Sequence, residues 1–317
     1  MKVPATIDDQ TRLHLRCAIC IATRNRRDDL EKTLAVVARL HPPPAEVLVT
    51  ADACTDDTVE WVRTHYPQHR LTANARALGS VGSRNAMFRD ATSEIVLILD
   101  DDSYPIETNF LAHLARLFEQ YPRAAIMTFP QRTDEFPESL NQPDFGPSYF
   151  AGTYVNCATA IRRSVFLDLG GYPDFFFNAY DEPDFTLRCV ASGWQARYET
   201  SLTIRHHFTG AQRNEMRTHH NHARNELWSV LMRCPAPQLF AVALFRVARQ
   251  FGYAWRRGLG WVVHEPKWWW TALRGIPKCW QHRRPIPWRR YRAWMDLIRQ
   301  PIHSETEWLA KFCDKPR

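Results

Sequence analysis

Three consecutive acidic residues follow the most apolar segment of the chain. Residues 94–99 (EIVLIL) lead directly into Asp100, Asp101 and Asp102, and such a continuous apolar run is typical of a strand buried on both faces. Adjacent carboxylates repel one another, so a cation should offset them. On an extended backbone Asp100 and Asp102 point to the same side. Paired carboxylate oxygens suit Mg²⁺ or Mn²⁺, so the pattern favours a divalent metal site over a solvated acidic turn or helix cap.

A second acidic cluster contains Asp181, Glu182 and Asp184, and it follows the aromatic run at residues 175–177. A carboxyl group beside an apolar wall has a raised pKa and can act as a general base. The alternative is the acidic first turn of a helix, which the helix dipole favours. These residues alone favour that simpler interpretation.

Two further segments give weaker signals. Residues 205–208 (RHHF) can supply a histidine ligand to a metal, although the chain uses histidine freely elsewhere. Residues 79–85 (GSVGSRN) combine a glycine-bearing helix start with Arg84, which is suited to a phosphate, but the spacing matches no standard nucleotide fingerprint.

Short apolar runs alternate with helical patterns over the first half of the chain, which is typical of a parallel α/β sheet. Residues 131–150 are rich in Pro, Asp, Glu and Asn and predict a long surface loop. We predict strands over 16–22, 46–50, 70–73, 94–99 and 154–161, and helices over 28–39, 56–64, 79–91, 163–169 and 182–192.

Charge divides the 317 residues into two regions. Residues 1–213 hold 22 basic and 27 acidic side chains, whereas residues 214–317 hold 19 and 7, together with ten of the 12 tryptophans. Different partners are therefore expected for the two regions. We predict an N-terminal tail at 1–14, an acidic-leaning body at 15–213 and a basic helical region at 214–317.

The basic region suggests a surface partner. Tryptophan prefers the membrane interface, and each Lys or Arg near an anionic membrane contributes about 1 kcal/mol. Helices lying in the interface are our favoured hypothesis. The alternatives are tryptophans packed against the body at 15–213 and, least favoured, stacking on single-stranded nucleic acid.

The cysteines and the apolar segments indicate a compartment. Eight cysteines are scattered among apolar neighbours, which favours reduced thiols in the cytoplasm. The N-terminal residues lack the apolar core of a secretory signal. No apolar run reaches the roughly 20 residues of a bilayer span, so we expect a cytoplasmic protein bound peripherally to the membrane.

The order and spacing of the segments resemble the family 2 glycosyltransferases with the GT-A fold. The resemblance covers roughly residues 15–210, includes the histidine after the last strand, His206, and implies that residues 15–213 form the catalytic domain. The matching segments are 20–25 (CIATRN), 49–58 (VTADACTDDT), 79–85, 97–102 (LILDDD), 160–172 (AIRRSVFLDLGGY) and 181–188 (DEPDFTLR).

This resemblance implies a Rossmann-like GT-A fold, a mixed α/β sheet flanked by helices, with the basic region as a helical extension rich in Trp and Arg. It also implies a nucleotide-diphosphate sugar as donor and Mn²⁺ or Mg²⁺ as cofactor. The implied residues are Thr23, Asn25, Asp52, Arg84, Asp100 and Asp101 for the donor, Asp100, Asp102 and His206 for the metal, Glu182 and Asp181 for catalysis, and Asp184 and Trp194 for the acceptor.

The function implied is inverting, metal-dependent transfer of a sugar to a glycan or lipid-linked acceptor hydroxyl, in the synthesis of cell-envelope polysaccharides. An anionic membrane surface is an expected partner, and nucleic acid is not. One rival is a sugar-phosphate nucleotidyltransferase of similar fold, whose Gly-rich basic N-terminal signature is absent here. The other is a non-catalytic protein that binds membranes or nucleic acid.

Overall fold

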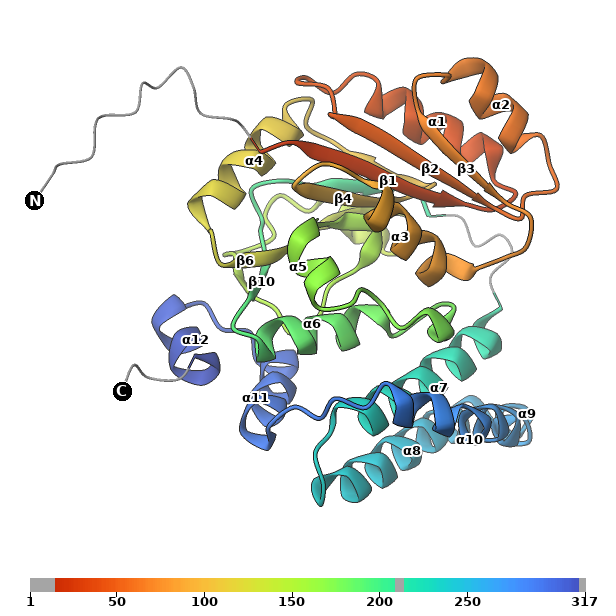
Figure 1. The fold of residues 1–317 in the computed structure, drawn as a ribbon, viewed down its shortest axis with the longest axis vertical. Coiled ribbons are helices and arrows are strands. Elements are labelled where there is room, and N and C mark those ends of the chain that lie inside the picture. Colours follow the sequence, from red (N-terminus) through yellow and green to blue (C-terminus); the bar gives the residue numbers. More distant parts are fainter. Residues whose placement is uncertain (1–14, 209–213, 314–317) are drawn as a thin grey trace, which may run out of the picture.

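A computed structural model describes residues 15–208 and 214–313. The predicted tail at 1–14 and the predicted boundary at residue 213 lie outside these described residues. In the described part, helices cover both faces of a sheet. A group of C-terminal helices lies below the helical layer that contains α6 (Figure 1).

The main sheet has eight strands in the order β3-β2-β1-β4-β9-β6-β10-β8. The first four in this order are parallel, and β9 runs antiparallel to both of its neighbours, which confirms the mixed sheet. The strands are β1 (Cys17–Thr23), β2 (Glu46–Asp52), β3 (Arg70–Asn74), β4 (Ile95–Asp100), β6 (Ala124–Thr128), β8 (Tyr149–Phe150), β9 (Thr159–Arg162) and β10 (Gln195–Tyr198).

A smaller sheet holds the strand that carries His206. It consists of β5 (Ser103–Pro105), β11 (Ile204–His206) and β7 (Gln131–Thr133), in the order β5-β11-β7. Because β5 begins just after the acidic triplet, pairing of His206 with Ser103 brings the histidine beside Asp102.

Two apolar cores, one on each face, explain the continuous hydrophobic strands. In β1, Ile19 and Ile21 enter the core under α1, α2 and α4, whereas Ala18 and Cys20 enter the core shared with α3, α5 and α6. Both faces of the strand are therefore buried. The helices are α1 (Arg27–Val37), α2 (Thr58–His65), α3 (Gly79–Asp90), α4 (Phe110–Gln120), α5 (Arg163–Asp168) and α6 (Asp181–Ala191).

Two sequence-based expectations differ from the structure. The segment at 131–150 is not a structureless loop, since it contains β7, a 3₁₀ helix (η1, Pro137–Asn141) and β8. The strand predicted over 154–161 is wrong in its first half, where a 3₁₀ turn (η2, Asn156–Ala158) precedes β9. The apolar residues of this turn are buried. Their hydrophobicity therefore reflects burial in the core, which the sequence pattern did not distinguish from a strand.

The C-terminal region is helical throughout its described part. Helix α7 packs against α8 and α10, and α11 packs against α6. The helices are α7 (Glu215–Arg233), α8 (Gln238–Arg257), α9 (Leu259–Val262), α10 (Glu265–Gln281), α11 (Trp288–Arg299) and α12 (Glu305–Phe312). Among the described residues, no helix is both long enough and apolar enough to span a bilayer.

A glycine sets the distance between α7 and α10. A Cβ added at Gly275 would overlap the ring of Trp228, whose indole N–H donates to the Ala272 carbonyl at 2.9 Å. A glycine at Gly252 in α8 has no such neighbour within 4 Å.

We expect Gly275→Ala to destabilise the protein by about 1–3 kcal/mol, because the Trp228 ring must move to admit the methyl group. The matched control Gly252→Ala should be neutral or stabilising by up to about 1 kcal/mol, since alanine favours a helix. Urea unfolding of both variants measures this. Equal stabilities would contradict the close approach.

Candidate active site

Two arginines neutralise the acidic triplet at the end of β4. Arg26 contacts Asp101 Oδ1 at 2.8 Å and Asp102 Oδ2 at 2.7 Å. Arg84 contacts Asp100 Oδ1 at 2.7 Å. The charge argument required such cations, but the sequence singled out only Arg84. Arg26 lies three residues after Thr23, at the start of α1, and its position became evident only in the fold.

The three carboxylates lie in different environments. Burial raises the pKa of Asp101 to about 8 despite Arg26 and a hydrogen bond of 2.8 Å from the Thr23 hydroxyl. Burial acts in the same direction on Asp102, but His206 and Arg26 hold its pKa well below the ordinary value. Of Asp101 and Asp102, Asp102 therefore has the more strongly stabilised charged form.

The His206 imidazole and the Asp102 carboxylate point toward each other, at a separation typical of two ligands of one metal ion. His206 Nε2 lies 3.2 Å from Asp102 Oδ1, yet both atoms are buried and neither makes a hydrogen bond. On the other side of the ring, Nδ1 lies 3.2 Å from Gln131 Oε1, an oxygen that can only accept a hydrogen bond. In the tautomer that carries its proton on Nδ1, His206 presents the Nε2 lone pair to a carboxylate oxygen, an arrangement that a cation stabilises.

The residues around this gap fit a divalent cation. Ligand atoms of Asp100, His206 and Cys157 all lie within 4.8 Å of one another. Burial raises the pKa of the Cys157 thiol, which instead donates to Gln131 at 3.1 Å. Asp100 and His206 remain from this group, and Asp102, whose Oδ1 lies 3.2 Å from His206 Nε2, would add a second carboxylate. Two carboxylates and one imidazole suit Mg²⁺ or Mn²⁺, and this ligand set stays a prediction.

The second acidic cluster opens α6 after a tightly turned backbone. Phe177, Ala179 and Tyr180 all have positive φ, a conformation that costs about 1–3 kcal/mol per residue and is concentrated at functional sites. Phe177 also lies directly against Gly79 at the start of α3. The turn places Asp181 and Glu182 at the N-terminus of α6.

A single amide holds both carboxylates. Asn156 Nδ2 donates to Asp181 Oδ2 at 2.9 Å and to Glu182 Oε1 at 2.8 Å. The Tyr172 hydroxyl donates to Asn156 Oδ1 at 3.0 Å and fixes its orientation. Burial, and then the neighbouring Asp181, raise the pKa of Glu182, as a general base requires. No sequence motif marked Asn156, and Tyr172 ends the matching segment 160–172 but was assigned no role there.

Arg84 joins the two acidic clusters. Its Nη1 lies 3.8 Å from Asp181 Oδ2, while its Nη2 contacts Asp100. One buried guanidinium thus connects the expected metal ligands to the expected base, and these groups form a single site.

The structure gives Asp184 a role other than the predicted acceptor contact. Its carboxylate is fully buried and accepts from Arg188 Nε at 2.9 Å, Arg233 Nε at 3.0 Å and the Ser229 hydroxyl at 2.9 Å. Those contacts hold the pKa of Asp184 at about 2 against the effect of burial. Asp184 therefore ties α6 to α7.

Trp194 is also remote from the site. It follows α6 at the end opposite Asp181, and a helix of this length extends about 15 Å. Its indole packs against the core on that face, so we correct its predicted acceptor contact to a packing role.

The remaining donor residues line the edge of the parallel strands. Asp52 accepts from the backbone N–H groups of Leu78 and Gly79 at 2.8 and 2.9 Å, which connects β2 to the start of α3. Asn25 both donates to and accepts from Thr55. Their contacts with a nucleotide stay predictions, as does that of Thr23.

We expect His206→Ala to weaken Mn²⁺ binding about tenfold or more, since even outer residues of metal sites contribute 10- to 100-fold. The matched control is His207→Ala, because His207 lies beside Asp29 instead, at 3.3 Å. Titration calorimetry with Mn²⁺ measures both variants. Equal losses would remove His206 from the proposed ligands.

Comparisons with known proteins find similar sequences and folds among glycosyltransferases. Residues 18–170 match glycosyl transferase family 2. An uncharacterized glycosyltransferase of Bacillus subtilis, YwdF, is 24% identical over 212 residues, which are 63% of this chain and 77% of the relative.

Two solved structures share the fold. The mannosyltransferase PcManGT from Pyrobaculum calidifontis, in complex with GDP-Man and Mn²⁺, is 19% identical with a TM-score of 0.55, over 94% of this chain and 90% of that one. GalNAc-T7 with UDP, GalNAc and Mn²⁺ is 12% identical with a TM-score of 0.58 over 74% of this chain, which spans 52% of that structure. These likenesses show that the chain has the GT-A fold, and its residues 18–170 match glycosyl transferase family 2.

Proposed function

We propose that the protein is an inverting, metal-dependent glycosyltransferase that uses a UDP- or GDP-sugar. The observation that carries this proposal is the single site in which Arg84 connects Asp100 to Asp181. Similar structures hold UDP or GDP-Man together with Mn²⁺. When bound by Asp100, Asp102 and His206, the ion would offset the charge that develops on the leaving diphosphate.

The proposed chemistry uses Glu182 as the base. An acceptor hydroxyl oxygen attacks the anomeric carbon, its proton passes to Glu182, and the bond from that carbon to the diphosphate oxygen breaks. Asn156 orients the Glu182 carboxylate, and burial keeps the pKa of Glu182 high enough to take a proton. One base and one in-line displacement invert the anomeric configuration.

We further propose that the protein lies peripherally on the cytoplasmic face of an anionic membrane and acts on a lipid-linked acceptor of cell-envelope polysaccharide synthesis. Large apolar side chains on α8, α9 and α10 are more than half exposed. They form an apolar face, made of Phe240, Leu244, Phe245, Trp255, Leu259, Val263, Trp270, Leu273 and Trp280.

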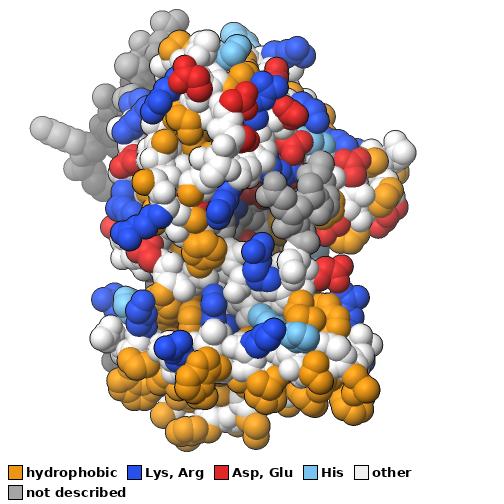
Figure 2. Space-filling model, turned by 90° about the vertical axis from the view of Figure 1, so that its right-hand side faces the viewer, with side chains coloured by type: hydrophobic (Ala, Val, Ile, Leu, Met, Phe, Trp, Pro, Cys, Tyr) orange, Lys and Arg blue, Asp and Glu red, His pale blue; other side chains and the backbone are white. Residues whose placement is uncertain are grey.

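The surroundings of the apolar face support this partner. Figure 2 shows hydrophobic side chains along the lower edge of the molecule, with Lys, Arg and His directly above them, an arrangement suited to lipid tails and anionic headgroups. The tryptophans divide between two roles, because Trp228, Trp268, Trp294 and Trp308 are buried inside the protein.

The rival functions predict different products. A nucleotidyltransferase would release pyrophosphate, and a silent binding protein would release nothing. Donor-dependent release of a nucleoside diphosphate in the presence of Mn²⁺ therefore tests the proposed class directly.

We expect Glu182→Gln to keep donor affinity while turnover falls about 10²- to 10⁴-fold, because the amide accepts no proton. Since burial raises the pKa of Glu182, wild-type kcat/KM should rise with pH well above 4.3, the ordinary value. The control Glu138→Gln changes an exposed glutamate and should leave donor affinity and turnover unchanged. Turnover of the Glu182 variant within about threefold of wild type would move the base to Asp181.

Binding to the membrane is tested by co-sedimentation with anionic vesicles at low and high salt. We expect binding that weakens but persists as salt rises, since salt screens charges beyond about 8 Å but leaves buried indoles unaffected. Trp255→Ser should weaken it, whereas the control Phe136→Ser, an equally exposed aromatic change on the catalytic domain, should not. Full-length protein that stays in the supernatant at low salt would exclude the membrane proposal.

A further inference from the structure

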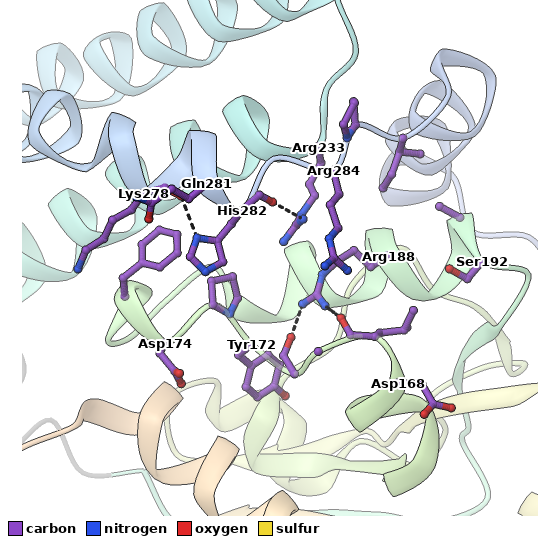
Figure 3. Close-up of a pocket in the computed structure, with 18 of the residues that line it drawn as sticks. Asp168, Tyr172, Asp174, Arg188, Ser192, Arg233, Lys278, Gln281, His282 and Arg284 are labelled. Carbon is purple, nitrogen blue, oxygen red and sulfur yellow. Dashed lines mark hydrogen bonds between the residues drawn. The ribbon is translucent and has the colours of Figure 1, made fainter.

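A cavity of about 850 Å³ lies at the junction of the catalytic domain and the C-terminal helices, apart from the site described above. Its floor is the segment 168–175 and part of α6, and its opposite wall is the end of α10 with the segment before α11. Figure 3 shows this cavity with basic side chains reaching in from several elements.

Three guanidinium groups converge in the cavity. Arg188 comes from α6, Arg233 from α7 and Arg284 from the segment between α10 and α11. Figure 3 shows the three side chains extending toward one another. Two of them, Arg188 and Arg233, share the carboxylate of Asp184, so like charges are held together with only one anion among them.

The remaining cations of the cavity lack acidic partners. Arg284 and Lys278 make no ion pair among residues 15–208 and 214–313, and both side chains are exposed. Two acidic residues line the cavity, Asp168 and Asp174. Asp174 accepts from Asn85 at 2.5 Å, and Figure 3 places both on the side away from Arg284. The four cations therefore outnumber the carboxylates.

We propose that this cavity binds a phosphate group, with Arg188, Arg233, Arg284 and Lys278 as its ligands. Guanidinium groups match the oxygens of phosphate in geometry and remain charged at all physiological pH values. Such an anion relieves the repulsion between the three arginines. This phosphate belongs either to a lipid headgroup or to a free phosphate compound. The headgroup is a candidate because Lys278 lies near the end of α10 that also carries Trp280 of the apolar face.

The bound anion bridges the C-terminal helices to the catalytic helix. Arg188 donates to the carbonyls of Leu169 and Gly171 at 2.7 and 2.6 Å, next to Tyr172, which orients Asn156. It also lies on the same helix as Glu182. Occupation of the cavity thus stiffens the elements behind the catalytic carboxylates. The binding itself uses neither donor nor metal, so its test does not depend on the proposed function.

The test is titration calorimetry of the full chain with inorganic pyrophosphate in metal-free buffer, where the acidic donor site has no ion to hold it. The Lys278→Ala/Arg284→Ala double variant should bind at least tenfold more weakly than wild type. The matched control, Lys267→Ala/Arg274→Ala, removes the same charge from α10 outside the cavity and should bind as wild type does.

Vesicles distinguish the source of the phosphate. If the cavity holds a headgroup, wild type should prefer phosphatidic acid to phosphatidylserine at equal surface charge, and only the Lys278/Arg284 variant should lose this preference. Pyrophosphate binding without such a preference assigns the cavity to a free anion. The proposal would be overturned if both double variants bind pyrophosphate with equal affinity and wild type shows no preference for phosphatidic acid over phosphatidylserine.

Discussion

The need to offset buried negative charge organises the catalytic half of the molecule. Five carboxylates, Asp100, Asp101, Asp102, Asp181 and Glu182, lie at the ends of β4 and α6, where unpaired charges would cost several kcal/mol each. Arg26 and Arg84 supply the compensation. Because Arg84 serves both groups, the expected metal ligands and the expected base are held in one fixed relation.

A second buried ion cluster connects the two regions of the chain. Asp184 on α6 binds Arg233 and Ser229 on α7, and removing one partner from a buried pair of this kind typically costs about 3–5 kcal/mol. In the same bundle, Glu226 pairs with Arg246 on α8 at 3.0 Å. These polar contacts fix the orientation of the helices whose apolar face we propose to meet the membrane.

The basic region therefore combines two kinds of surface. Its inner side chains, such as Trp294, complete apolar cores with α6 and β8, and the Trp294 indole donates to the Gly152 carbonyl at 2.9 Å. Its outer tryptophans, Trp255, Trp270 and Trp280, are about 60% exposed. Sequence composition does not separate these groups, because both consist of aromatic residues at helical spacing next to arginines.

The sequence by itself determined the parallel strands with flanking helices, the acidic triplet and the acidic start of α6, because burial of a strand on two faces and the first turn of a helix leave local patterns. The mixed character of the sheet, which comes from the antiparallel β9, was implied only by the family resemblance. The roles of Arg26, Asn156 and Gln131 were decided only by the tertiary structure. Each meets a partner at least 25 positions away along the chain, and no local pattern encodes such a distance. Asp184 shows the converse: its place in an acidic motif suggested the acceptor, but packing against α7 surrounded it with cations.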